Sequence, residues 1–158
     1  MDGQKNNCPF CSPVVEKATF AESNNFRAVY NIAPILPGHC LIIPKNHLSS
    51  LLDIPTTDMT EMMLFSRKII RVLSKAFGTS SYDWTIQEGQ PAGQTIEHLH
   101  IHIIPRTADD LPEPGDWYPR LEASEPMLID SFLRSKYSYA ELKSIVEKLS
   151  RIFIDQGA

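Results

Sequence analysis

The stretch His98–Ile104, HLHIHII, places three of the chain's five histidines on alternate residues. Successive side chains of a β-strand point to opposite faces of its sheet. The alternation therefore predicts a strand with imidazoles on one face and leucine and isoleucine on the other. The aliphatic face is expected to pack on a core, whereas the imidazole face must meet something polar. We favour a functional site over a merely solvated strand face.

Two kinds of chemistry suit three alternating imidazoles. A single three-histidine metal site is strained, because the Cα atoms of His98 and His102 lie about 13 Å apart at a strand's rise per residue, whereas bonds to zinc are about 2 Å long. Two of the three could share an ion. Alternatively, a neutral imidazole is a good nucleophile toward phosphorus, and its pKa lies near working pH. The preceding loop, Gly93–Thr95, could then supply backbone N–H groups to phosphate oxygens.

The composition is that of a soluble globular protein. The chain has 158 residues, 42% hydrophobic and 22% charged, which fits one domain spanning residues 1–158. Its net charge of −4 argues against general binding to nucleic acid or membrane surfaces, but a local site for a small anion is compatible with it. Three cysteines, a polar first segment and the lack of a long apolar run predict a cytoplasmic location, and a nuclear one also fits.

Hydrophobic periodicity divides the chain into strands and helices. Residues 26–31, 40–43, 82–88 and 98–104 have the composition of strands. Two helices are predicted, Asp58–Phe77 and Ser138–Ile154, each with a capping arrangement at its start (Asp58 with Glu61, Ser138 with Glu141). Two helices and about five antiparallel strands predict an α+β fold. Residues 1–7 are expected to be a flexible N-terminus, and residues 107–126, with four prolines, a mobile surface loop.

A second motif, CPFC, contains Cys8 and Cys11. A lone C-x-x-C is compatible with zinc binding, with redox chemistry or with unliganded thiols. The redox interpretation needs a helix that begins at the motif and lowers a thiol pKa, and Pro9 and Pro13 make such a helix unconvincing. Cys40, in an apolar predicted strand, is expected to lie in the core.

Together these residues resemble the histidine triad (HIT) family. Gln87–Arg106, QEGQPAGQTIEHLHIHIIPR, is most similar to the Fhit branch of diadenosine polyphosphate hydrolases, and residues 31–44, NIAPILPGHCLIIP, are similar to that branch's first hairpin. The resemblance covers roughly residues 8–158. It implies a HIT-like fold with an antiparallel sheet of about five strands and two main helices. It also implies a symmetric homodimer that meets at the first helix and the strand that follows it.

The resemblance also implies site residues. The catalytic group would be His98, His100 and His102, in which His100 attacks the α-phosphorus of a nucleotide and water then releases the nucleoside monophosphate. His102 would hydrogen-bond phosphate oxygens or support His100, and Gln87 would contact the bridging or leaving oxygen. The other implied residues are Gly93, Gln94, Thr95 and Ile96 at the phosphates, Asn31 at the ribose hydroxyls, and His39, which would hold the hairpin or assist His100.

Other HIT proteins imply a structural zinc bound by Cys8, Cys11, His47 and His98, a set well suited to tetrahedral zinc. Magnesium would accompany the substrate's phosphates, and no organic cofactor is expected. The implied substrate is a dinucleoside polyphosphate such as diadenosine triphosphate, cleaved to AMP and ADP. A Hint-like phosphoramidate hydrolase, a nucleotidyl transferase and a nucleotide-sensing signalling protein remain alternatives, although the long C-terminal helix favours the Fhit branch over Hint.

Overall fold

A five-stranded antiparallel sheet in the order β1-β2-β3-β5-β4 organises the molecule. The computed structural model describes residues 8–124 and 136–156, so the expected flexible segment 1–7 lies outside them. The strands are β1 (Thr19–Glu22), β2 (Phe26–Tyr30), β3 (Cys40–Pro44), β4 (Ser81–Ile86) and β5 (Ile101–Arg106). The helices are α1 (Thr56–Phe77), α2 (Trp117–Ser124) and α3 (Tyr139–Asp155). The predicted α+β fold with five antiparallel strands is confirmed.

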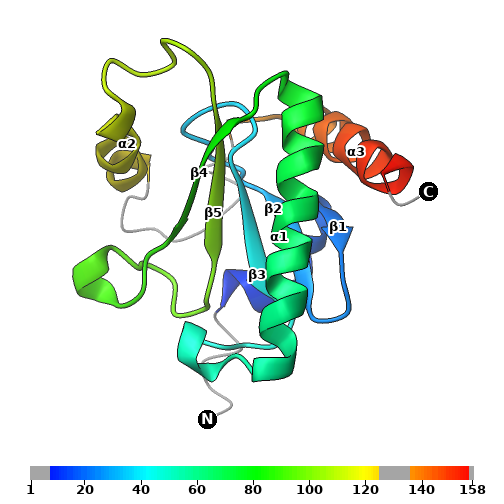
Figure 1. Cartoon of the computed structure of the whole chain (residues 1–158), viewed down its shortest axis with the longest axis vertical. Coiled ribbons are helices and arrows are strands. Elements are labelled where there is room, and N and C mark those ends of the chain that lie inside the picture. The colour runs from blue at the N-terminus through cyan, green and yellow to red at the C-terminus, as the bar shows by residue number, and fades with distance from the viewer. Residues whose placement is uncertain (1–7, 125–135, 157–158) are drawn as a thin grey trace.

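The core lies between the sheet and two long helices. Helix α1 packs across the sheet, and α3 packs beside it and against β1 (Figure 1). Apolar side chains of α1 are buried at helical spacing, among them Met62, Ile69 and Leu73. Gly78 ends α1 in the left-handed conformation, with a φ of 67°. The predicted capping box of α3 is present, because the Ser138 hydroxyl accepts from the Glu141 N–H and the Glu141 carboxylate accepts from the Ser138 N–H.

The predicted cap of the first helix is wrong. Helix α1 begins two residues earlier, after Pro55, without a side-chain cap. The Glu61 carboxylate instead accepts hydrogen bonds from the Ser23 hydroxyl at 2.6 Å and from the Asn25 backbone N–H at 2.8 Å. Glu61 therefore holds the turn between β1 and β2 against the helix.

The histidine strand begins later than its alternation predicts. β5 starts at Ile101, which pairs with Ile42 of β3 and Ile86 of β4, so His98 and His100 lie outside the ladder. β4 ends at this register, and β3 continues to Pro44 but pairs there with β2 alone. The extended segment before Ile101 is held by a bond from the Leu99 N–H to the Leu48 carbonyl at 2.6 Å. The catalytic candidates thus lie where the sheet opens toward its surrounding loops.

The segment predicted as a loop over residues 107–126 contains regular structure. A short 3₁₀ turn, Pro114–Asp116, leads into α2, and residues 125–126 lie outside the described part. Arg106 anchors the start of this segment, since its guanidinium bonds Asp83 at 2.7 Å, Asp110 at 2.8 Å and the Pro114 carbonyl at 2.9 Å. None of the helices in residues 8–124 and 136–156 combines the length and the apolar composition of a membrane span.

Candidate active site and metal group

All three alternating histidines are buried. The exposed fractions of His98, His100 and His102 are 0%, 3% and 1%. The imidazole face is therefore not a solvated surface, and each ring needs partners inside the protein. The structure gives each ring different neighbours: thiols beside His98, an aromatic ring beside His100 and another imidazole beside His102.

The hydrogen bond of His100 defines its tautomer. The ring Nδ1 lies 2.7 Å from the backbone carbonyl of His98. A carbonyl oxygen only accepts, so Nδ1 must carry the proton and donate it. Neutral His100 then has its lone pair on Nε2, the atom that a nucleophilic imidazole uses. The rings of His100 and His102 are 5.0 Å apart between centroids, so one phosphate group can reach both.

A chain of bonds likewise orients His102. The backbone N–H of Ile35 donates to Nδ1 of His39, which leaves Nε2 of His39 as the donor. That Nε2 lies 3.0 Å from Nδ1 of His102, which therefore accepts, and the proton of His102 resides on Nε2. Nε2 of His102 is buried, and in the described part of the chain it has no hydrogen-bond partner. A buried donor without a partner is costly unless a ligand completes it.

Burial keeps these imidazoles neutral. Desolvation, reinforced by the nearby His100 and Lys136, lowers the pKa of fully buried His39 to about 3. Desolvation, followed by His100 and His39, also lowers the pKa of His102 well below its ordinary value. Both rings remain uncharged at neutral pH. Each ring therefore has one donor nitrogen and one acceptor nitrogen, as the tautomers of His39 and His102 given above require.

Asn31 connects the hydrogen-bonded pair of His39 and His102 to the adjacent cavity. Its side-chain amide nitrogen lies 3.4 Å from Nδ1 of His39, and its side-chain oxygen accepts from the Ala33 N–H at 2.9 Å. Asn31 also lines a mostly apolar cavity beside the site. The predicted ribose residue and the predicted hairpin residue are therefore neighbours, although eight positions separate them.

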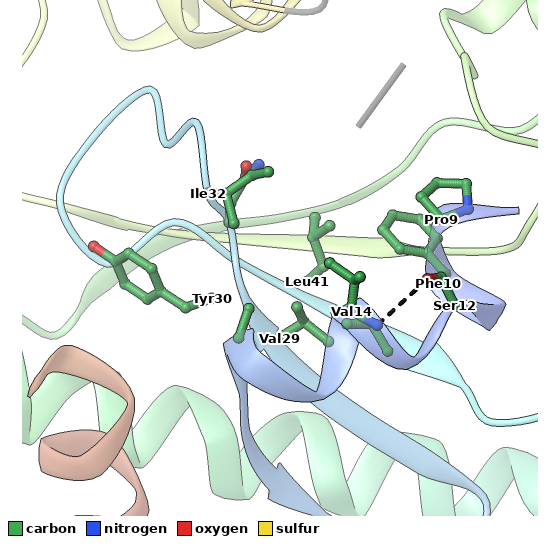
Figure 2. A pocket seen from close by; sticks show the side chains of 11 residues that line it. Pro9, Phe10, Ser12, Val14, Val29, Tyr30, Ile32 and Leu41 are labelled. Carbon is green, nitrogen blue, oxygen red and sulfur yellow. Dashed lines mark hydrogen bonds between the residues drawn. The ribbon is translucent and has the colours of Figure 1, made fainter. Parts of the chain in front are cut away.

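The cavity beside Asn31 has a volume of about 240 Å³. In Figure 2, Pro9 and Phe10 close one end of the cavity and Tyr30 lies at the other, with Val29 and Leu41 forming its floor. Such a cavity, with an apolar lining and one amide at its edge, suits a flat heterocycle attached to a polar group. Its lining residues are Pro9, Phe10, Ser12, Val14, Val15, Ala18, Val29, Tyr30, Asn31, Ile32 and Leu41.

Most of this lining was not predicted from the sequence. Only Asn31 was identified there, because it matched a family position. Val29 in β2 and Asn31 just after it are two positions apart, which could have indicated a shared face. Nothing in the sequence indicates that Phe10 meets that face.

The predicted phosphate loop lies beside Gln87, whose exposed fraction is 7%. Gly93 has a φ of 93°, and a Cβ at this position would lie 3.0 Å from the amide nitrogen of Gln87 and 3.1 Å from the Tyr118 hydroxyl. The backbone N–H groups of Gly93 and Gln94 already donate to the carbonyls of Gln90 and Gly89. Gln87 and Tyr118 thus both lie beside Gly93, and the two N–H groups are bonded within the loop. A role for Gly93 and Gln94 at the phosphates stays a prediction.

The remaining loop residues lie farther along the same turn. The side-chain oxygen of Gln94 accepts from the Gly89 N–H at 2.7 Å, so this side chain closes the loop. Thr95 is exposed and Ile96 is half-buried, and the Ile96 carbonyl accepts from the His98 N–H at 2.8 Å. Tyr118 was not predicted as part of the site, because the segment that contains it carries little sequence periodicity.

The second predicted group also comes together. The potential ligand atoms of Cys8, Cys11, His47 and His98 all lie within 4.8 Å of one another. Nδ1 of His98 is 3.4 Å from the Cys8 sulfur, and Nδ1 of His47 is 3.3 Å from the Cys11 sulfur. Two thiols and two imidazoles that lie this close together form a donor set that suits zinc.

Hydrogen bonding around these residues fits a metal. Nε2 of His98 lies 2.9 Å from the Pro44 carbonyl and must donate to it, which turns the Nδ1 lone pair toward the sulfurs. Desolvation raises the pKa of the Cys8 thiol to about 11 in the absence of a cation. A redox cysteine needs the opposite shift, and the Pro9–Cys11 segment is a single 3₁₀ turn that provides no helix dipole. The donor set thus fits a metal better than redox chemistry.

Comparison with known proteins gives a consistent result. Residues 12–109 match the family model of the HIT domain. The chain is 39% identical over 113 residues to the asymmetrical bis(5'-nucleosyl)-tetraphosphatase of Schizosaccharomyces pombe, and the match covers 72% of this chain and 62% of that protein. It is 32% identical over 126 residues to the bis(5'-adenosyl)-triphosphatase of Dictyostelium discoideum, which covers 80% of this chain and 78% of that protein.

A solved structure shares the fold. The Zn-bound histidine triad family protein of Mycobacterium smegmatis superposes with a TM-score of 0.64 at 23% identity, over 98% of this chain and 99% of that one. The architecture described above therefore extends over nearly the whole of both chains.

Proposed function

The chain belongs to the HIT domain family, and on that premise we propose that it is a nucleotide hydrolase that cleaves a phosphoanhydride of a dinucleoside polyphosphate, such as diadenosine triphosphate to AMP and ADP. The names of the two curated relatives support this class of substrate. The observation that carries the proposal is the buried Nε2 of His102, a donor without a partner in the described residues, beside a nucleophilic nitrogen of His100. An anionic phosphate oxygen would complete it.

His100 is the proposed nucleophile. Its Nε2 attacks the α-phosphorus, a N–P bond forms, and the P–O bond to the remaining phosphates breaks with its electron pair on the leaving oxygen. Water then attacks the same phosphorus, the N–P bond breaks, and the nucleoside monophosphate leaves. The bond from Nδ1–H to the His98 carbonyl would stabilise positive charge on the ring during both steps.

The other residues have supporting roles in this proposal. His102 donates to a nonbridging phosphate oxygen, and His39 holds it in the required tautomer. Gln87 contacts the leaving oxygen, because its amide lies beside the loop of Gly93. Asn31 meets the ribose at the edge of the cavity, whose apolar walls hold the base. Thr95 and Ile96 line the entrance to the phosphate site.

We further propose that Cys8, Cys11, His47 and His98 hold structural zinc. The proximity of their four ligand atoms and the orientation of His98 by Pro44 support this assignment. Zinc there would cross-link the N-terminal segment to the catalytic strand, while the residues of the site perform the chemistry. Magnesium is proposed only as a companion of the substrate's phosphates.

A homodimer and a cytoplasmic or nuclear location complete the proposal. Met63 and Leu64 on α1 expose half of their surface, and Tyr82 lies on β4, an edge strand of the sheet. Apolar side chains on a helix and on a neighbouring edge strand would be covered by a second copy. The described cysteines form no disulfide, which accords with a reducing compartment.

Product analysis tests the proposed reaction. Purified protein is incubated with diadenosine triphosphate, diadenosine tetraphosphate and adenosine phosphoramidate, and the products are separated by chromatography. We expect AMP and ADP from the triphosphate, and no product with His100→Asn, whose binding of nucleotide is retained. Preference for the phosphoramidate would contradict the substrate and favour a Hint-like hydrolase. Binding of all three without turnover would favour a nucleotide sensor.

A further inference from the structure

Phe10 lies at the junction between the metal group and the nucleotide site. Its ring is 5.6 Å from the ring of His98 and 5.4 Å from that of His100, edge to face in both pairs. Phe10 also forms one end of the cavity (Figure 2). In sequence it stands between Cys8 and Cys11. One side chain therefore touches a ligand of the metal group, the proposed nucleophile and the wall of the base pocket.

The backbone around Phe10 has little support of its own. The segment Pro9–Cys11 is a single 3₁₀ turn, closed by bonds from the Cys11 N–H to the Cys8 carbonyl and from the Ser12 N–H to the Pro9 carbonyl. Short 3₁₀ turns have poor hydrogen-bond geometry and little intrinsic stability. Besides the packing of Phe10 on the core, the sulfurs of Cys8 and Cys11, at the two ends of this turn, connect it to His98 and His47.

The floor of the cavity is independent of the metal group. Val29 and Leu41 face each other across β2 and β3 and are buried in the sheet. Sheet hydrogen bonds fix these residues whether or not a cation is bound. The end of the cavity formed by Pro9, Phe10 and Ser12 is instead joined in sequence to Cys8 and Cys11.

We propose that Phe10 transmits occupancy of the metal group to the nucleotide site. Zinc bound by the four ligands fixes the turn and holds Phe10 against the cavity and against His100, so that zinc and nucleotide each favour binding of the other. The proposal rests on the proposed function and adds a regulation of that function. Loss of zinc weakens nucleotide binding, and Phe10 is the only nucleotide contact that this loss removes. By linkage, nucleotide must tighten zinc by the same factor.

AMP binding tests the coupling directly. Calorimetry measures the AMP affinity of protein loaded with one equivalent of zinc and of protein stripped with a chelator, and circular dichroism checks the fold of both. Couplings between sites are commonly about 5- to 150-fold, and we expect zinc to raise the AMP affinity of the wild type by about tenfold, within that range. In Phe10→Ala the affinity should be weaker and the zinc effect should vanish. Phe10→Leu, which keeps an apolar side chain at this end of the cavity, should retain part of the zinc effect.

Val29→Ala is the matched control, because it enlarges the same cavity from the sheet side. It should weaken AMP binding yet keep the zinc effect of the wild type. Equal zinc effects in the wild type and Phe10→Ala, or no zinc effect in the wild type, would overturn the inference. If zinc-loaded wild type does not bind AMP, the proposed nucleotide site itself fails, which is a different result from binding that is insensitive to zinc.

A second measurement covers the case in which stripped protein unfolds. Zinc release from the loaded protein to a chromophoric chelator is followed with and without saturating AMP. AMP should slow release several-fold in the wild type and in Val29→Ala, and leave it unchanged in Phe10→Ala. Equal slowing in Phe10→Ala would show that the coupling, if present, bypasses Phe10 and would refute the proposal.

Discussion

Substitution of Gly93 by alanine isolates the contact that we place at the leaving oxygen. Gly93 has a φ of 93°, and its added Cβ would lie 3.0 Å from the amide nitrogen of Gln87 and 3.1 Å from the Tyr118 hydroxyl. Two effects therefore combine, backbone strain and displacement of Gln87. The control Gly78→Ala separates these two effects. Gly78 ends α1 at a φ of 67°, so alanine there is strained, but its Cβ would meet no atom within 4 Å.

The two effects have different magnitudes and different readouts. An L-residue in the left-handed region costs about 1–2 kcal/mol, which lowers the melting temperature by about 2–8 °C for a domain of this size. Gly93→Ala and Gly78→Ala should share this loss. Displacing a donor from developing charge costs about 10²-fold in kcat, and only Gly93→Ala should show it.

The assay is steady-state hydrolysis of diadenosine triphosphate, with calorimetric melting of each variant. We expect a lower kcat for Gly93→Ala and an unchanged kcat for Gly78→Ala at similar melting temperatures. If Gly93→Ala melts as expected but keeps the kcat of the wild type, then Gln87 does not act at the leaving oxygen and the assignment is wrong.

Two further predictions concern stability. Burial holds the pKa of His39 at about 3, far below its value of about 6.5 in the unfolded state. Between these two pH values the unfolded state therefore binds more protons than the folded state. The free energy of unfolding should fall as the pH decreases below about 6.5, by up to about 1.4 kcal/mol per pH unit for this residue. Denaturant unfolding from pH 7 to pH 4 should show a shallower loss in His39→Asn than in the wild type, and equal slopes would contradict the buried neutral ring. Arg106→Ala leaves Asp83 and Asp110 without their guanidinium and should cost about 2 kcal/mol. Proteolysis within residues 107–124 should become faster, whereas Lys143→Ala, which removes an exposed pair, should change neither.

The sequence was informative where a pattern is local. Alternation in His98–Ile104 predicted the opposed faces, and Ser138 with Glu141 predicted the start of α3. β1 was not identified, because Thr19–Glu22 is only four residues long and its pairing with β2 includes an irregular register. The Asp58 cap was wrong because Glu61 finds stronger partners in a turn 38 residues away.

The site required contacts that no local pattern encodes. Cys8 and His98 are 90 residues apart, and only the family resemblance joined them before the fold was known. The tautomers of His100 and His102 follow from backbone groups at His98 and Ile35, which the sequence cannot position. The position of Phe10 against the rings of His98 and His100 likewise depends on a tertiary contact that the CPFC motif does not encode.

The most direct test of the account is the detection of a covalent intermediate on His100. Protein is mixed with diadenosine triphosphate, quenched without acid within milliseconds, and measured by intact-mass spectrometry and peptide mapping. The account predicts one adenylyl group per chain, located on the peptide that contains His100 and missing from His100→Asn. Full turnover without an adduct, together with activity in His100→Asn, would contradict nucleophilic catalysis by this residue.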